Sequence, residues 1–188
     1  MIALRSYEQN GPASRTITSR PDLIGGHDMA QKSLVAYFSA TGTTRELAKR
    51  LAKATGADLF EITPTEPYTT ADLDWRNENS RSSVEMHDPS SRPAITGMPK
   101  KLDSYDVVYI GFPIWWYTAP QIVKTFLESG DFAGKSLALF ATSGSSGMGD
   151  TLEALVPCSP DAWWLGADRF DANASVGELK EWVEDLGL

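Results

Sequence analysis

The sequence predicts an α/β fold built on a doubly wound, five-stranded parallel sheet with the strand order 2-1-3-4-5. Two observations carry this prediction. Five short apolar segments typical of strands alternate with segments whose apolar residues recur at helical spacing. One strand segment, residues 107–111, is apolar throughout, as expected of a strand covered on both faces. Such alternation folds with right-handed crossovers, and this strand order makes the first, third and fourth strands neighbours.

The first strand and the first helix are predicted from the start of the periodic part of the chain. The strand covers residues 33–38, and the helix covers residues 44–55 with an apolar face. Thr43 and Glu46 have the spacing of a capping box for this helix. Gly56 is expected to end the helix, because glycine readily adopts the left-handed conformation found there.

A long polar connection separates the second and third strands. The second strand is predicted over residues 58–62, and the connection covers residues 68–99 with a short helix over residues 70–82. It is too poor in apolar residues to form core, and long ordered connections in compact domains often act as lids. We therefore expect this segment to pack beside a functional site.

The second half of the chain repeats the alternation of strands and helices. Pro120 suits the first turn of a helix, and Ser175 with Glu178 forms a second capping box. The predicted strands cover residues 107–111, 136–141 and 162–165, and the predicted helices cover residues 120–129, 150–156 and 176–186.

The 188 residues are interpreted as one domain preceded by an extension. Residues 1–31 are rich in Arg, Ser, Gly, Pro and Asn and show no sustained period, whereas residues 32–188 carry the strand and helix pattern. No apolar segment in the extension has the length of a signal peptide. Met29 stands just before the first strand, so residues 1–28 are expected to lie outside the core.

Composition and charge narrow the classes of partner. The formal net charge of −8 disfavours nucleic acid and anionic membranes and suits basic protein partners. No apolar run approaches the ~20 residues of a membrane span, so a cytoplasmic location is expected. The single cysteine, Cys158, and the two histidines, His27 and His87, lack the spacing of metal ligands. We therefore predict neither a disulfide nor a metal site.

The loop between the first strand and the first helix is the most informative segment. Residues 39–44 read Ser-Ala-Thr-Gly-Thr-Thr, and Gly42 permits a tight turn. A helix N-terminus offers free backbone N–H groups and the positive end of the helix dipole to an anion. A phosphate could bind here without a basic residue in the loop. The alternative interpretation is an ordinary hydroxyl-rich helix cap that holds no ligand.

Other phosphate-binding motifs do not fit this loop. The Walker A pattern is absent, and so is the G-x-G-x-x-G fingerprint of dinucleotide-binding folds.

Two further loops are expected at the same edge of the sheet. Residues 112–120 follow the third strand and are crowded with aromatic side chains, and residues 142–149 follow the fourth strand and are rich in Ser and Gly. Together with the hydroxyl loop, they suit a phosphorylated planar aromatic ligand, because the rings can stack and small residues expose backbone N–H groups. Aromatic core packing and a flexible connector are the alternatives for the two segments.

Taken together, these segments resemble the flavodoxin family. The similarity is to a branch with G-x-P-x-W-W after the third strand, here residues 111–116, and T-S-G-x-S-G after the fourth, here residues 142–147. Residues 92–95 and 181–183 are also similar to that branch. The resemblance covers residues 33–188 and implies a flavodoxin-like fold with FMN as a non-covalent cofactor.

The resemblance also implies three groups of FMN-binding residues. The loop after the first strand would hold the phosphate, the loop after the third would border the isoalloxazine, and the loop after the fourth would line the ribityl and pyrimidine side. In that order, the implied residues are Ser39, Thr41, Gly42, Thr43 and Thr44; Pro113, Ile114, Trp115 and Trp116; and Thr142, Ser143, Gly144, Ser146 and Gly147.

Flavodoxin-like proteins transfer electrons, so the resemblance implies a redox partner protein or a small electron acceptor such as a quinone. An acidic, aromatic site should disfavour negative charge on the reduced flavin, which implies a low potential. The long connection and the lack of acidic residues in 113–120 favour the alternative of an FMN-dependent NAD(P)H:quinone-type oxidoreductase. The absence of a nicotinamide-binding motif favours a carrier. A non-catalytic FMN-binding regulatory module is a further alternative, and no oligomeric state is predicted.

Overall fold

A parallel sheet of five strands in the order β2-β1-β3-β4-β5 forms the centre of the structure, which confirms the predicted fold class. The structure is a computed structural model, and it describes residues 31–188. The interpretation of residues 1–31 as an extension falls, except for Gln31, outside the described residues. The strands are β1 (Ser33–Tyr37), β2 (Asp58–Glu61), β3 (Val107–Pro113), β4 (Ser136–Thr142) and β5 (Trp163–Phe170).

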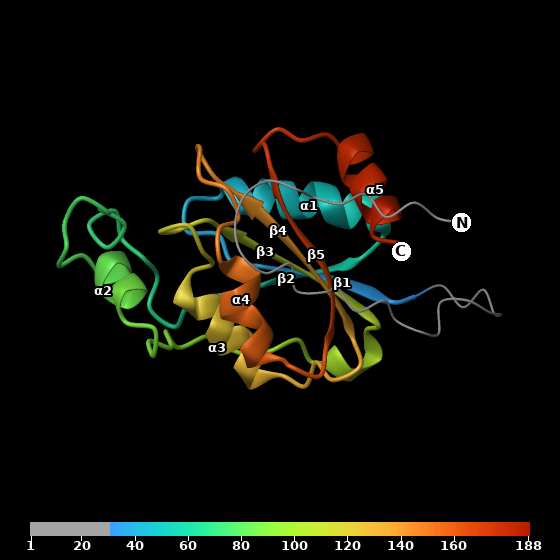
Figure 1. The fold of residues 1–188 in the computed structure, drawn as a ribbon, viewed down its shortest axis with the longest axis horizontal. Coiled ribbons are helices and arrows are strands. Elements are labelled where there is room, and N and C mark those ends of the chain that lie inside the picture. Colours follow the sequence, from blue (N-terminus) through green and yellow to red (C-terminus); the bar gives the residue numbers. More distant parts are fainter. Residues whose placement is uncertain (1–30) are drawn as a thin grey trace.

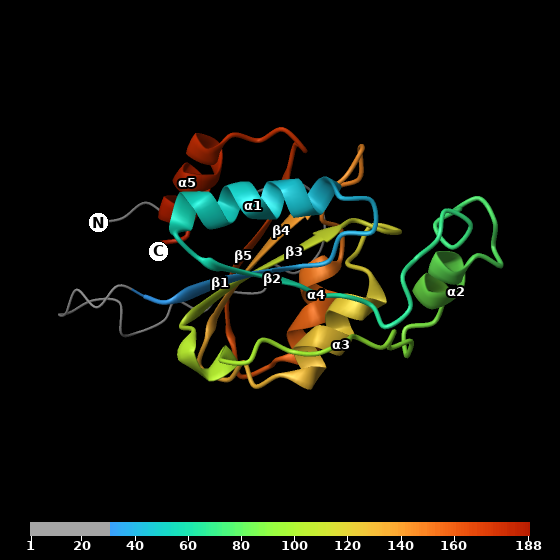
Figure 2. The ribbon, with the colours of Figure 1, turned by 180° about the vertical axis from the view of Figure 1, so that it is seen from behind.

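Helices cover both faces of this sheet (Figures 1 and 2). One face packs against α1 (Thr43–Thr55) and α5 (Val176–Asp185), and the opposite face packs against α3 (Gln121–Ser129) and α4 (Thr151–Leu155). The short helix α2 (Arg81–His87) lies apart from both layers.

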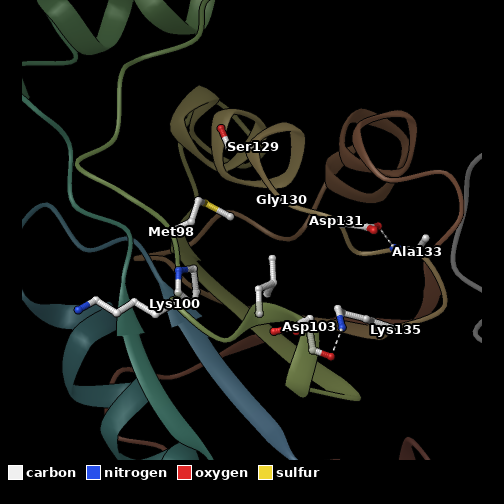
Figure 3. A pocket seen from close by; sticks show the side chains of 10 residues that line it. Met98, Lys100, Asp103, Ser129, Gly130, Asp131, Ala133 and Lys135 are labelled. Atoms are coloured by element: carbon white, nitrogen blue, oxygen red, sulfur yellow. Dashed lines mark hydrogen bonds between the residues drawn. The ribbon is translucent and has the colours of Figure 1, made fainter.

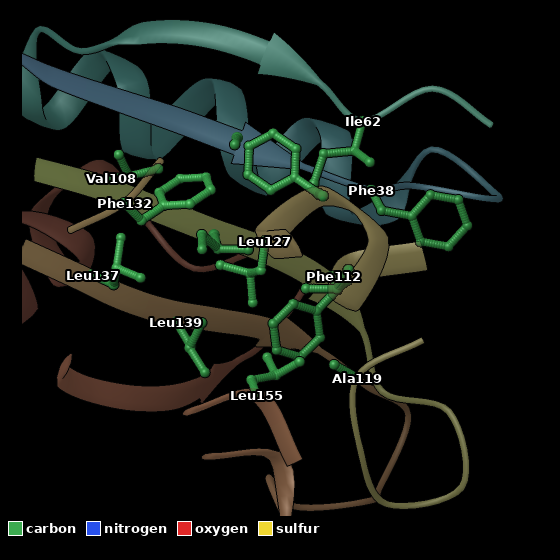
Figure 4. Close-up of a cluster of buried hydrophobic side chains, with 14 of the residues drawn as sticks. Phe38, Ile62, Val108, Phe112, Ala119, Leu127, Phe132, Leu137, Leu139 and Leu155 are labelled. Atoms are coloured by element: carbon green, nitrogen blue, oxygen red, sulfur yellow. The ribbon is translucent and has the colours of Figure 1, made fainter. Parts of the chain in front are cut away.

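Two apolar clusters, one on each face of the sheet, form the core. β3 contributes side chains to both clusters, because alternate residues of a strand point to opposite faces. Its residues Val108, Ile110 and Phe112 join the cluster under α3 and α4, part of which Figure 4 shows. A Cβ atom on Gly111 would lie 2.1 Å from the ring of Phe140, so only glycine fits at this position. This close packing fixes the part of β3 that leads into the aromatic loop.

Of the two predicted capping boxes, one is wrong and one is confirmed. The prediction that Thr43 and Glu46 form a capping box is wrong. Gly42 occupies the N-cap of α1 with φ 93° and no side-chain cap, and Glu46 instead pairs with Lys49 at 2.7 Å. The capping box of α5 is confirmed: Ser175 Oγ accepts from Glu178 N at 3.1 Å, and Glu178 Oε2 accepts from Ser175 N at 2.8 Å.

The helix predicted over residues 70–82 is also wrong. Residues 70–80 form turns and bends, and the helix begins at Arg81. Ser80 sets this start, because its Oγ accepts from the backbone N–H of Ser83 at 3.3 Å. The strand predicted over residues 162–165 is longer than expected and continues to Phe170.

The connection between β2 and β3 leaves the sheet through a narrow neck. Thr65 N donates to Ala94 O at 2.8 Å, and Thr96 N donates to Thr63 O at 2.9 Å. The residues between these two hydrogen bonds, 66–93, are called the excursion below. The excursion projects beyond the edge of the sheet at which the strands have their carboxyl ends, with α2 near its tip (Figures 1 and 2).

Candidate functional site

Three loops meet at the carboxyl edge of β1, β3 and β4, as the sequence predicted. The hydroxyl loop (residues 39–44) and β4 are joined by the hydroxyls of Thr44 and Thr142, whose oxygens lie 2.8 Å apart in a buried contact. The aromatic loop after β3 (residues 112–120) reaches the same strand end, because Ile114 N donates to Thr142 O at 2.9 Å. Thr142 therefore links all three segments.

The hydroxyl loop is a fixed turn with free backbone donors. Ser39 Oγ accepts from the backbone N–H groups of Gly42 at 3.1 Å and Arg45 at 3.2 Å, which fixes the turn. The neighbouring amides of Thr41, Thr43 and Thr44 donate to no acceptor within residues 31–188. Free amides at the start of a 13-residue helix attract an anion through hydrogen bonds and through the helix dipole.

The hydroxyls of this loop differ in their surroundings. Thr41 and Thr43 are exposed, and their hydroxyl oxygens lie 3.5 Å apart. Thr44 is buried and already shares a hydrogen bond with Thr142. Two hydroxyls that share one hydrogen bond retain one further proton between them, so this pair can still donate to a ligand.

The aromatic residues after β3 form a tight turn. Trp115 and Thr118 exchange two backbone hydrogen bonds of 3.0 Å across it. Trp116 and Tyr117, at the tip, have φ of 46° and 64°. Bulky residues rarely adopt positive φ, and each such residue costs on the order of 1–3 kcal/mol. Tyr117 is 68% exposed, so apolar burial offsets little of its strain, whereas Trp116 is 37% exposed and partly covered. Strained residues cluster at functional sites, which makes this turn a candidate for one.

Trp115 is the half-buried ring of this turn. Its ring lies edge-on to Phe38 at 5.6 Å and to Tyr68 at 5.5 Å between centroids. Trp116 faces the ring of His87 from α2 at 6.1 Å. Pro113 and Ile114, which precede these rings, are half-buried. Sequence reasoning missed Phe38, Tyr68 and His87, because no spacing in the chain connects them to the aromatic turn.

The Ser/Gly loop after β4 lies beside this turn. Gly149, at φ 48°, is packed so closely that an added Cβ would lie 2.1 Å from the carbonyl oxygen of Tyr117. Ser143 Oγ accepts from Ser145 N at 3.2 Å, and Ser146 is half-buried. In contrast, Cβ atoms on Gly144 or Gly147 would meet no atom within 4 Å. The open side of the loop therefore has room for a ligand.

A cavity lies at the opposite, amino edge of the sheet (Figure 3). It has a volume of about 550 Å³ and an apolar wall that includes Met98 and Leu102. Its buried Lys135 donates to the carbonyl oxygens of Asp103 at 3.3 Å and Tyr105 at 2.8 Å. The ammonium group of Lys135 is thus largely occupied by backbone carbonyl groups.

Neither a cluster of metal ligands nor a membrane-spanning helix is found in the part of the chain that the structure describes. Residues 31–188 contain no group of three or more His, Cys, Asp or Glu side chains that could hold a metal ion. None of the helices in that range is long and apolar enough to span a bilayer.

Comparison with known proteins identifies the class that this fold and site define. The flavodoxin family profile matches residues 32–186, so the chain belongs to the flavodoxin family. FMN is therefore the cofactor that the family assigns to the chain. The free amides of the hydroxyl loop and the open side of the Ser/Gly loop fit a phosphorylated flavin.

Solved structures agree with this assignment. A candidate flavoprotein from Bacteroides eggerthii is 46% identical, with a TM-score of 0.80 over 84% of this chain and 99% of that one. A candidate flavoprotein from Bacteroides uniformis is 49% identical, with a TM-score of 0.78 over 82% of this chain and 98% of that one. A Lactobacillus acidophilus flavoprotein solved with FMN is 20% identical, with a TM-score of 0.65 over 81% and 99%, and shows a shared fold.

A curated relative carries the name of an enzyme. The Escherichia coli protein YcaK, named an uncharacterized NAD(P)H oxidoreductase, is 27% identical over 97 residues. This match covers 51% of the present chain and 44% of YcaK, which is less than half the length of that relative.

Proposed function

We propose that this protein transfers electrons through FMN held non-covalently at the carboxyl edge of β1, β3 and β4. The observation that carries the proposal is the set of free amides at Thr41, Thr43 and Thr44, at the start of α1 and beside an aromatic turn. A phosphate accepts hydrogen bonds from these amides and is stabilised by the helix dipole.

Each loop has its own role in this proposal. The hydroxyl loop binds the phosphate, with Ser39 and Gly42 forming the turn and Thr41, Thr43 and Thr44 supplying donors. Pro113, Ile114, Trp115 and Trp116 border the isoalloxazine and exclude water. Thr142, Ser143, Gly144, Ser146 and Gly147 line the ribityl and pyrimidine side. Bound FMN supplies the redox chemistry, and the protein orients it and sets its electrostatic surroundings.

The phosphate assignment is tested by comparing three flavins. FMN, riboflavin and FAD are titrated into the flavin-free protein, and binding is followed by quenching of flavin fluorescence. FMN should bind most tightly, because riboflavin lacks the phosphate and FAD carries an adenylate that the single anion site does not accommodate. Equal affinity for riboflavin and FMN, or selective binding of FAD, would overturn the assignment.

A second candidate function is reduction of a small acceptor such as a quinone by NAD(P)H. The similarity to YcaK favours it, and so does the excursion, whose Tyr68 and His87 contact the aromatic turn. A carrier remains the leading proposal, because the chain shows no nicotinamide-binding motif.

The neck of the excursion offers a way to separate the two functions. A variant in which two glycines replace residues 66–93 keeps the hydrogen bonds of Thr63, Thr65, Ala94 and Thr96. The variant is first loaded with FMN. Its activity is then assayed with NAD(P)H plus a quinone and, separately, with a reduced or oxidised protein partner. Selective loss of quinone turnover would support the reductase, and selective change with the protein partner would support the carrier. Unchanged rates with both would remove any role of the excursion in access to FMN.

A further inference from the structure

We infer that Arg81, Glu85 and Tyr68 form a positioning group that fixes the ring of Trp115 at the flavin site. This inference rests on the proposed function. All three residues belong to the excursion, outside the FMN-binding motifs, and they reach the site through the ring of Tyr68.

The ion pair at the base of this group is well shielded. Arg81 Nε lies 2.7 Å from Glu85 Oε1, and the two side chains are 24% and 12% exposed, the lowest values for an ion pair within residues 31–188. Arg81 Nη1 also donates to the carbonyl oxygen of Glu66 at 2.8 Å. The arginine therefore joins α2 to the segment that leaves the neck.

Tyr68 is held from two directions by this pair. Its hydroxyl donates to Glu85 Oε2 at 2.5 Å, and the guanidinium of Arg81 lies 4.1 Å from the centroid of its ring. Burial and the neighbouring carboxylate of Glu85 raise the pKa of Tyr68. The phenol therefore keeps its proton and remains a donor to Glu85 at physiological pH, which suits a fixed structural contact.

The fixed ring of Tyr68 closes an aromatic triangle. Its centroid lies 5.5 Å from that of Trp115 and 5.7 Å from that of Phe38, and Trp115 lies 5.6 Å from Phe38. Phe38 is 1% exposed and follows β1, so the sheet fixes its position. Edge-to-face rings have a preferred geometry. The orientation of Trp115 is consequently set on one side by the sheet and on the other by the excursion.

Attachment of the excursion to the domain does not depend on this group alone. The neck supplies two backbone hydrogen bonds, and Arg92 makes a two-point ion pair with Glu128 of α3, at 2.6 and 2.9 Å. Arg92 has no ring contact with Trp115. An Arg92→Gln variant is therefore a matched control, because it loosens the excursion without touching the aromatic triangle.

The test follows the indole N–H signal of Trp115 by ¹⁵N NMR in flavin-free protein. The chain has six tryptophans, so the signal is assigned by its loss in Trp115→Phe. Tyr68→Phe removes only the hydroxyl and should shift the Trp115 signal. Glu85→Ala should shift it further, Glu85→Gln should largely restore it because the amide oxygen still accepts from Tyr68, and Arg92→Gln should leave it unchanged.

The same variants are then compared in the presence of FMN. Tyr68→Phe should weaken FMN binding by about threefold to tenfold, as for a lost hydrogen bond of about 1 kcal/mol, and should change the midpoint potential. Arg92→Gln should change neither. If Tyr68→Phe leaves the Trp115 signal and the midpoint potential as in the wild type, the inference is overturned, even if Glu85→Ala does not fold. A shifted indole signal without any FMN binding would keep the positioning group and overturn the proposed function.

Discussion

The excursion is stabilised in a different way from the sheet and the helices that cover it. Side chains such as Ile110, Phe112 and Phe126 are fully buried between the sheet and α3. In the excursion, Trp75 is 68% exposed and Val84 is 55% exposed. The sheet region depends on apolar burial shared by many residues, and the excursion depends on a few ion pairs and ring contacts. Substitutions in the sheet region should therefore affect overall stability, and substitutions in the excursion should affect ligand binding.

The largest expected effect is on the apolar core. Phe112→Ala should lower the free energy of unfolding by about 3–5 kcal/mol, because a fully buried ring is replaced by a cavity. Trp75→Ala in the excursion removes a larger ring but should cost no more than about 0.5 kcal/mol, because that ring is exposed. Both values are measured by chemical denaturation. Similar losses for the two variants would refute the distinction between the regions.

A smaller effect is expected where the sheet meets the candidate site. Thr44→Val keeps the shape of the side chain but removes the hydroxyl that contacts Thr142 at 2.8 Å. FMN binding should weaken by about 1–3 kcal/mol, as for a lost hydrogen bond near a charged group. Riboflavin binding should change much less, because riboflavin has no phosphate. Equal losses for the two flavins would show that this loop does not bind the phosphate.

The ion pair that joins the excursion to α3 should contribute less. Arg92→Gln breaks a pair whose side chains are 34% and 40% exposed. The free energy of unfolding should therefore fall by only about 0.2–1 kcal/mol. Hydrogen exchange should accelerate in the excursion and stay unchanged in β3 and β4. Faster exchange throughout the sheet would mean that the two regions unfold as one unit.

The smallest effect concerns a polar contact within the sheet region. Burial raises the pKa of the Asp168 carboxyl, although the indole N–H of Trp182 donates to it at 2.8 Å and lowers the pKa in part. The folded state then binds a proton more tightly than the unfolded state, so the carboxyl contributes stability at low pH that is lost as pH rises through its folded pKa. Asp168→Asn should therefore raise the stability at pH 7. The gain should fade below about pH 4, where the wild-type carboxyl is protonated in both states. A gain that is independent of pH would contradict this account.

Much of the sheet region could be predicted from sequence because its signals are periodic. The apolar run of β3 and the Ser175–Glu178 capping box led to elements that the structure contains. The errors fall where local chemistry competes with the pattern. Gly42 adopts positive φ and occupies the N-cap position predicted for Thr43. Ser80 caps α2, so that helix starts at Arg81, near the end of the predicted range of 70–82.

The candidate site was predictable only in part, for a related reason. Short motifs after β1, β3 and β4 located the three loops, because parallel strands bring their carboxyl ends to one edge. The contacts of Trp115 with Phe38 and Tyr68 carry no such signal, since they join residues that are far apart in the chain and depend on how the excursion folds back.

Because of the neck between β2 and β3, the geometry of the sheet does not depend on the length of the excursion. Because the Thr65–Ala94 and Thr96–Thr63 hydrogen bonds hold the two chain ends side by side, residues can be added or removed beyond them without moving either strand. The entropy of closing a loop grows only slowly with its length. This part of the chain can therefore diverge in length and sequence while the sheet and the hydroxyl loop at its edge keep their geometry.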